Sequence, residues 1–222
     1  MQFKTVKFSQ LVIEQGFNYR SKFNYGDVES LGKRLLETGF NHMPPLRVVL
    51  METPTTIKYK VIGGFRRCAG INTLPTSVLV EAEIPVLIEP KSISEVDQVI
   101  LAYVDNDDHL ATGPWENAQT VKRLRKLGKK DRDIAQALGV SQSQVSQLGV
   151  LDMISGMSET ISEAGQQGRI AATLVWQLYA DFQKREPIPP VTEFVKELET
   201  ELEKAGDKGV TAKAFVFKGR EK

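Results

Sequence analysis

The sequence predicts an α/β domain followed by an all-α domain, and two observations lead to this prediction. Up to about residue 90, short runs rich in β-branched residues are bounded by Pro, Thr or Gly, a pattern typical of strands. After Ser92 the apolar residues recur with helical spacing to about Lys184. We therefore expect domains at 1–91 and 92–186, followed by a C-terminal segment at 187–222.

Three strands and one helix are expected in the first domain. The strands are Leu46–Met51, Ile57–Gly64 and Ile84–Glu89. Between Asp27 and Thr38, apolar residues at helical spacing predict an amphipathic helix, and Gly39 follows as its C-terminal stop.

Composition and charge set limits on the class of protein. The chain has 222 residues, of which 41% are hydrophobic and 26% charged, and it contains no run of eighteen apolar residues. Neither a membrane span nor a secretion signal is indicated, so we expect a cytoplasmic protein. The single cysteine, Cys68, and the two histidines, His42 and His109, argue against a disulfide and against a structural metal centre.

The end of the second predicted strand is a candidate phosphate site. There the sequence YKVIGGFRR runs through Gly63 and Gly64 into a predicted helix start with Arg66 and Arg67. Helix N-terminal amides and arginines bind phosphate, and glycine lets an anion reach the backbone. The same residues also suit a tight strand-to-helix turn whose arginines pair with carboxylates, and the residues alone favour neither interpretation.

The strongest local pattern of the second domain is DRDIAQALGVSQSQVSQL, Asp131–Leu148, which predicts a helix-turn-helix within 131–150. Gly139 supplies the turn, and Ser141 with Gln144 forms a capping box at the start of the second helix. The outer face of that helix carries polar groups that can hydrogen-bond base edges in a DNA major groove. The candidate base-reading residues are Gln142, Ser143, Gln144, Ser146 and Gln147.

A basic cluster directly precedes this pattern, although the net charge of the whole chain is only +1. Lysine and arginine neutralise DNA phosphates without reading sequence, so we expect backbone contacts here. The alternatives are a solvated helix face and a small helical hairpin with a polar outer face, but DNA binding is favoured because capping, turn glycine and apolar spacing coincide. The cluster comprises Lys122, Arg123, Arg125, Lys126, Lys129, Lys130 and Arg132, with Lys126, Lys129 and Lys130 as the expected phosphate contacts.

Together these motifs resemble the ParB-type partition proteins. YKVIGGFRRCAG is similar to the family's Gly-Glu-Arg-Arg box, LAYVDNDDHLATGPWENAQTVKRL resembles the region of its Glu-Asn-x-x-Arg box, and the resemblance covers about residues 3–184. It implies a ParB/sulfiredoxin-like fold for 1–91, double-stranded DNA and CTP with Mg²⁺ as ligands, a homodimer on DNA and a partition ATPase as partner. The nucleotide-binding residues that it implies are Gly63, Gly64, Arg66, Arg67, Arg20 and Asn106, with Asp105 as the Mg²⁺ ligand.

Three positions depart from the family's motifs. Phe65 replaces glutamate, Asp105-Asn106 replaces Glu-Asn, and His109 replaces arginine. Because an aromatic ring cannot polarise an attacking water, we expect slow or no CTP hydrolysis, and we expect Phe65→Glu to raise it if the rest of the site is competent. Phe65 also stands where sulfiredoxin, which shares this fold, has its nucleophilic cysteine, and Cys68 is interpreted as a small buried side chain. For Asp105, the alternative is a polar helix end.

The C-terminal segment 187–222 is shorter than the dimerisation domain that the resemblance implies. Its apolar stripe along Val191–Leu202 predicts a helix that pairs with its twin or packs on its own domain. The basic tail 206–222 either contacts DNA or keeps the chain soluble.

We therefore interpret the chain as a short ParB-like DNA-binding protein of a plasmid, phage or mobile element, acting in partition or regulation with a CTP-dependent clamp switch. Two alternatives belong to other classes. One is a helix-turn-helix transcriptional repressor without nucleotide dependence. The other is a metal-dependent nuclease that uses Asp105, Asp107 or Asp108.

Overall fold

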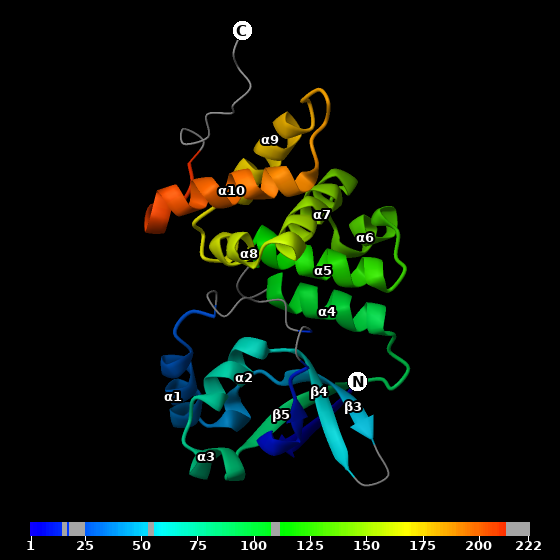
Figure 1. Cartoon of the computed structure of the whole chain (residues 1–222). Coiled ribbons are helices and arrows are strands. Elements are labelled where there is room, and N and C mark those ends of the chain that lie inside the picture. Colours follow the sequence, from blue (N-terminus) through cyan, green and yellow to red (C-terminus); the bar gives the residue numbers. More distant parts are fainter. Residues whose placement is uncertain (15–16, 18–24, 53–55, 108–111, 212–222) are drawn as a thin grey trace. The chain divides into compact units, whose positions relative to one another are not determined.

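The chain divides into two compact units. The computed structural model describes residues 1–14, 17, 25–52, 56–107 and 112–211. Unit 1 is Met1–Thr112 and unit 2 is Gly113–Lys222 (Figure 1). The division differs from the expected boundary after residue 91, because helix α4 (Glu95–Asp107) packs against strand β4 of unit 1. Helical periodicity shows where the helices start but not which domain a helix packs against.

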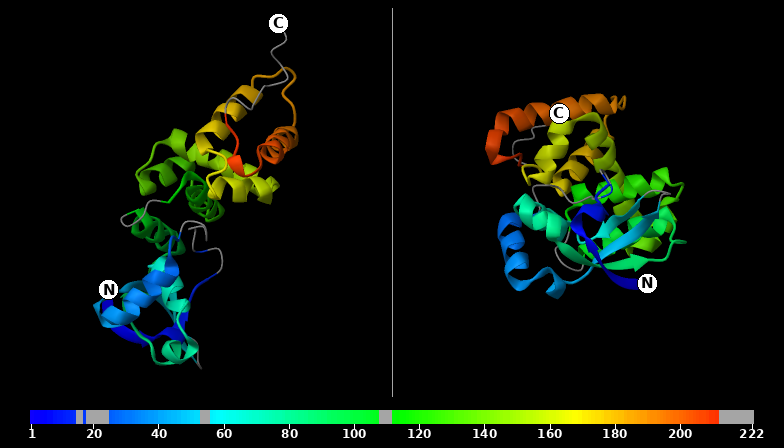
Figure 2. Two further views of the ribbon diagram at one scale, coloured as in Figure 1. Left: turned by 90° about the vertical axis from the view of Figure 1, so that its left-hand side faces the viewer. Right: turned by 90° about the horizontal axis from the view of Figure 1, so that it is seen from below.

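Unit 1 contains a mixed five-stranded sheet in the order β1-β5-β3-β4-β2. Strand β1 (Gln2–Lys7) is antiparallel to β5 (Glu83–Glu89), and β3 (Leu46–Glu52) is parallel to β5. Strand β4 (Ile57–Gly63) is antiparallel to β3, and the short β2 (Leu11–Val12) is parallel to β4. Strand β1 lies at one edge of the sheet and β2 at the other, and both are coloured dark blue in Figure 2. The three predicted strands are β3, β4 and β5, whereas β1 and β2 were not predicted.

Helix α1 (Val28–Thr38) begins and ends where the sequence predicts. Asp27 Oδ1 accepts a hydrogen bond of 2.9 Å from the Ser30 amide, and Gly39 ends the helix with a φ of 84°. Both signals act within a few residues of the helix end, which is why they can be recognised without the rest of the fold.

Helix α2 (Phe65–Asn72) is held against α1 by close contact between two glycines. A methyl group added at Gly32 of α1 would lie 2.2 Å from the carbonyl oxygen of Gly70 in α2. Because neither residue has a side chain, the two backbones approach closely, and this approach sets the position of α2 against α1. The short helix α3 (Thr76–Glu81) then leads into β5.

The described part of unit 2 is helical, apart from an isolated bridge between Ile170 and Val210. Helix α5 packs against α7, and α8 and α10 pack against the same helix. Large side chains that are fully buried within residues 113–211 include Leu124, Ile134, Leu151, Ile154, Ile161, Phe182 and Phe194. The helices are α5 (Pro114–Lys126), α6 (Asp131–Leu138), α7 (Gln142–Met157), α8 (Glu159–Gln166), α9 (Ala172–Phe182) and α10 (Val191–Ala205).

The apolar stripe of α10 packs on its own unit. Phe194 and Leu198 are fully buried, and α10 contacts α7 and α8. Of the two alternatives predicted for this stripe, the structure therefore shows packing on its own domain. The first part of the expected tail follows it, with Val210 buried beside Ile170, while residues 212–222 lie outside the described part of the chain. None of the helices described is long and apolar enough to span a bilayer.

Candidate functional site

The predicted strand-to-helix turn lies between β4 and α2. Gly64 adopts a left-handed conformation, with φ of 85° and ψ of 26°, and is the N-cap of α2. A methyl group added there would lie 2.6 Å from Leu46 Cδ2 and 2.9 Å from an Arg67 guanidinium nitrogen. Both the backbone angle and the lack of space therefore require glycine at this position.

A carboxylate from α4 occupies the anion position of this turn. The Gly64 amide donates a hydrogen bond of 2.9 Å to Asp105 Oδ2, and a methyl group added at Gly63 would lie 2.8 Å from the same oxygen. A helix N-terminus favours negative charge, and here the chain supplies that charge itself. Among the described residues, no group of three His, Cys, Asp or Glu side chains could hold a metal ion, so Mg²⁺ at Asp105 stays a prediction.

Both arginines of the turn donate to backbone carbonyls. Arg66 Nε donates to the Tyr25 carbonyl at 2.7 Å, while Arg67 Nη1 donates to the carbonyls of Pro44 and, at 3.2 Å, Pro45. Burial lowers the pKa of Arg67, and the nearby charge of Asp105 opposes that shift. The arginines thus tie the start of α2 to the segments before α1 and β3. Both arginines thus have backbone carbonyls as partners, whereas the alternative interpretation expected carboxylates, and their role in nucleotide binding stays a prediction.

Phe65 and Cys68 belong to the core of unit 1. The Phe65 side chain is only 3% exposed, and its ring centroid lies 6.5 Å from that of Phe17. Cys68 is fully buried, as predicted, and burial raises the pKa of its thiol to about 12. Arg20, Asp108 and His109 lie outside the described residues, and so do the side chains of Asn106 and Asp107.

The α6–α7 pair has the predicted turn and cap. Gly139 adopts the left-handed conformation with φ of 68°. Ser141 Oγ accepts from the Gln144 amide at 3.1 Å, and Gln144 Oε1 accepts from the Ser141 amide at 2.8 Å, which completes the capping box. The two helices meet through apolar residues at the predicted helical spacing. Ile134, Ala135, Leu138, Val145 and Leu148 are buried, while Val140 in the turn is half-buried.

The first turns of α7 expose a polar face. Gln147 is half-buried, and its carbonyl accepts a hydrogen bond of 2.9 Å from Trp176 Nε1. Gln144 uses its side-chain oxygen in the cap, which leaves its amide NH₂ group for other partners. The exposed members of the predicted set are Gln142, Ser143, Gln144 and Ser146.

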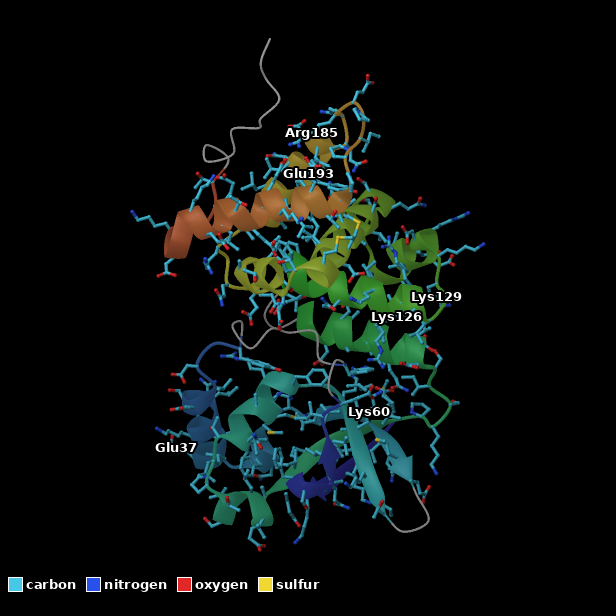
Figure 3. All side chains as sticks on the ribbon, in the orientation of Figure 1. Glu37, Lys60, Lys126, Lys129, Arg185 and Glu193 are labelled. Carbon is cyan, nitrogen blue, oxygen red and sulfur yellow. The ribbon has the colours of Figure 1, made fainter. Side chains whose placement is uncertain are left out.

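The basic cluster separates into paired and exposed cations. Lys122 forms an ion pair of 2.8 Å with Asp152, and Arg125 forms two hydrogen bonds with Asp131. The three predicted phosphate contacts, at the end of α5 and in the turn that follows, are exposed, and the structure gives them no ion pair with any described residue. They are Lys126, Lys129 and Lys130, of which Figure 3 labels the first two.

No protein-family model and no curated protein sequence matches the chain. Three solved structures resemble it. The C-terminally truncated chromosome-partitioning protein ParB from Caulobacter crescentus, complexed to the centromeric parS site, is 18% identical with a TM-score of 0.46, over 77% of this chain and 81% of that one. The same protein complexed with CTP-gamma-S is 16% identical with a TM-score of 0.38, over 89% and 98%. A Pnob8-like ParB-N domain is 15% identical with a TM-score of 0.44, over 92% and 82%.

These structural neighbours are ParB proteins. ParB-type proteins are also the family whose motifs the sequence resembles. The predicted fold class, an α/β domain followed by an all-α domain, is confirmed by the sheet of unit 1 and the helices of unit 2.

Proposed function

We propose that the chain is a ParB-like DNA-binding protein in which α6 and α7 form a helix-turn-helix and the start of α7 reads bases. The observation that carries this proposal is the capped first turn of α7, where Gln142 and Ser143 are exposed while Val145 and Leu148 on the opposite face are buried. A helix held from behind in this way can present its N-terminal side chains to a major groove. The exposed amides and hydroxyls are suited to base edges.

The exposed lysines at the end of α5 complete the proposed interface. Lys126, Lys129 and Lys130 have no anionic partner among the described residues, so their charge is available for DNA phosphates. Such contacts fix the position of a protein on the duplex, while α7 supplies selectivity.

The turn at Gly63 and Gly64 is the proposed CTP site, with Mg²⁺ held by Asp105, as the resemblance to the Gly-Glu-Arg-Arg box implies. Within this proposal, CTP acts as a clamp switch for a homodimer on DNA that works with a partition ATPase. The chain then serves partition or regulation of a plasmid, phage or mobile element.

A transcriptional repressor without nucleotide dependence is the second candidate. It is favoured by the internal partners of the turn, since Asp105 already accepts from the Gly64 amide and both Arg66 and Arg67 donate to carbonyls. A triphosphate has to replace Asp105 before it can accept from the Gly64 amide.

DNA selection tests the first proposal. Duplexes selected from a random pool are compared with unselected duplexes over a series of salt concentrations, with the full chain. Gln142→Ala should weaken binding to the selected site by about 1–3 kcal/mol and binding to random duplex much less. Gln177→Ala, an exposed glutamine on α9, is the matched control and should change neither. Equal losses on both duplexes would show that Gln142 does not read bases.

Calorimetry separates the two candidates. Binding of CTP is measured against ATP, GTP and UTP, and affinity for the selected duplex is measured with and without each nucleotide. A preference for CTP together with a CTP-dependent change in DNA binding supports the switch. The same DNA affinity in all conditions, with no nucleotide bound, supports the repressor.

A further inference from the structure

We infer that Arg125 and Gly149 form a positioning pair that sets helix α7 against α5, and that Arg125, although it belongs to the basic cluster, acts through α7 rather than on DNA. This inference rests on the proposed DNA-binding function. It assigns a role in DNA selectivity to Arg125, one cation of the cluster. It assigns the same role to Gly149, which no sequence motif identifies.

Arg125 ties the last turn of α5 to the first residue of α6. Its Nε donates to Asp131 Oδ1 at 2.9 Å and its Nη2 donates to Asp131 Oδ2 at 2.7 Å. A two-pronged contact of this kind fixes the plane of the guanidinium group as well as its distance. The contact favours one orientation of the side chain and engages its Nε and Nη2 donors.

The held guanidinium group lies against the backbone of α7 at Gly149. A methyl group added at Gly149 would lie 2.3 Å from Arg125 Nη1 and 2.9 Å from Nη2. The tip of an unrestrained arginine could move aside, but here such a movement breaks the hydrogen bonds to Asp131. Glycine inside a helix lowers helix stability relative to alanine. The close approach of Arg125 gives a physical reason for glycine at this position.

A second contact holds the same two helices one turn away. Lys122 of α5 and Asp152 of α7 form an ion pair of 2.8 Å, and each lies three residues from Arg125 or Gly149 along its helix. Residues three apart share a helix face, so both contacts lie along one α5–α7 interface. Asp152 also contributes to raising the pKa of Arg125, after the larger effect of Asp131.

The consequence concerns the two halves of the proposed interface. The exposed Lys126 extends from the last turn of α5, whereas Gln142 lies at the start of α7. Binding groups have to be held within about 0.5 Å of a productive arrangement. The Arg125–Gly149 pair fixes the helix that carries the phosphate contact relative to the helix that carries the base contact. A chain positioned by its phosphate contacts therefore also has its base-reading residues in position.

A stability cycle tests the pair without DNA. Thermal unfolding is measured for Arg125→Ala, Gly149→Ala and the double variant. Gly149→Ala should give a higher Tm, relative to its parent, in the Arg125→Ala background than in the wild type. In that background the added methyl group meets no guanidinium. Gly156→Ala is the matched control, since nothing lies within 4 Å of its added methyl group, and its effect should be the same in both backgrounds. An identical effect of Gly149→Ala in both backgrounds would refute the inference that Arg125 and Gly149 act as a pair.

DNA binding tests the positioning role. Arg125→Ala and Gly149→Ala should each reduce the ratio of affinities for selected over random duplex, on the order of tenfold, with an unchanged salt slope. Lys126→Ala should instead weaken binding to both duplexes. It should also reduce the slope of log affinity against log salt concentration by about one. A slope reduced equally by Arg125→Ala would make Arg125 a phosphate contact and refute the inference. A wild-type chain that selects no duplex would remove the proposed function, while the stability cycle would still decide whether the pair exists.

Discussion

The Gly64 amide, at the start of α2, donates a 2.9 Å hydrogen bond to Asp105 Oδ2, a carboxylate that comes from α4. The turn between β4 and α2 is therefore built to attract an anion and already contains one. Two roles for Asp105 follow, and they have opposite consequences. As an internal anion it competes with a triphosphate, whereas as a Mg²⁺ ligand it assists triphosphate binding.

Asp105→Asn separates these roles. Loss of the negative charge should raise CTP affinity on the order of tenfold if Asp105 competes, because a hydrogen bond to a charged group contributes roughly 1.5–3 kcal/mol. The measurement is calorimetry with and without Mg²⁺. Asp97→Asn is the control, because Asp97 accepts from Ser94 Oγ in the first turn of the same helix. A fall in affinity that appears only with Mg²⁺ would instead make Asp105 the metal ligand.

Phe65→Glu should unfold or strongly destabilise unit 1 instead of raising hydrolysis. The Phe65 side chain is 3% exposed and lies against Phe17, so a glutamate there buries a charge without a partner. The expected loss is about 3–5 kcal/mol, compared with a smaller loss for Phe65→Leu, which removes volume but keeps the side chain apolar. Urea unfolding followed by circular dichroism measures both. A Phe65→Glu chain as stable as the wild type would show that this ring is not needed in the core.

Asp131→Asn should lower the stability of unit 2 in a pH-dependent way. The hydrogen bonds from Arg125 lower the pKa of Asp131 below its usual value near 3.9. The pair therefore stabilises the fold fully above that usual value, and this contribution is lost as the pH falls through the lowered pKa. Because the Asp131 side chain is 45% exposed, we expect no more than about 1 kcal/mol.

Unfolding curves of this variant and the wild type should therefore differ at pH 6 and converge in strong acid. Asp133→Asn changes another acid in the first turn of α6 and controls for the helix dipole. A difference that stays constant down to strong acid would exclude the ion pair as its cause.

Cys68 should be inert to thiol reagents in the folded chain. Burial raises the pKa of its thiol to about 12, so almost no thiolate is present at pH 8. Reaction with a chromogenic disulfide should be slow in buffer and complete in denaturant, where the thiol regains its ordinary pKa of about 8.5. Rapid labelling in buffer would mean that unit 1 opens readily around α2.

Local signals account for what the sequence predicted well. The N-cap Asp27, the stop at Gly39 and the capping box of Ser141 and Gln144 act within a few residues, so they define α1 and the α6–α7 turn without knowledge of the fold. Strand β1 was not predicted because among its residues only Val6 is buried, which leaves no alternating pattern to recognise.

Contacts between distant residues account for what the sequence did not predict. Gly64 and Asp105 are 41 residues apart, and no local pattern pairs them, so the turn was predicted but its internal carboxylate was not. The basic cluster was identified as a unit, yet the fold gives Lys122 and Arg125 acidic partners on other helices. A stretch of positive charge in a sequence does not distinguish cations that face acids from cations that face solvent.

The pairing of β1 with β5 also determines when unit 1 can be completed during synthesis. Gln2 lies opposite Ile88, so the first strand of this sheet to leave the ribosome has no partner until β5, the last strand of the sheet, has emerged. Closing so long a loop costs entropy and slows folding relative to the local contacts of helices. A nascent chain that ends before Glu83 leaves β1 exposed to proteases and chaperones. Limited proteolysis of ribosome-bound chains of increasing length should show β1 protected only after Glu89 has cleared the exit tunnel.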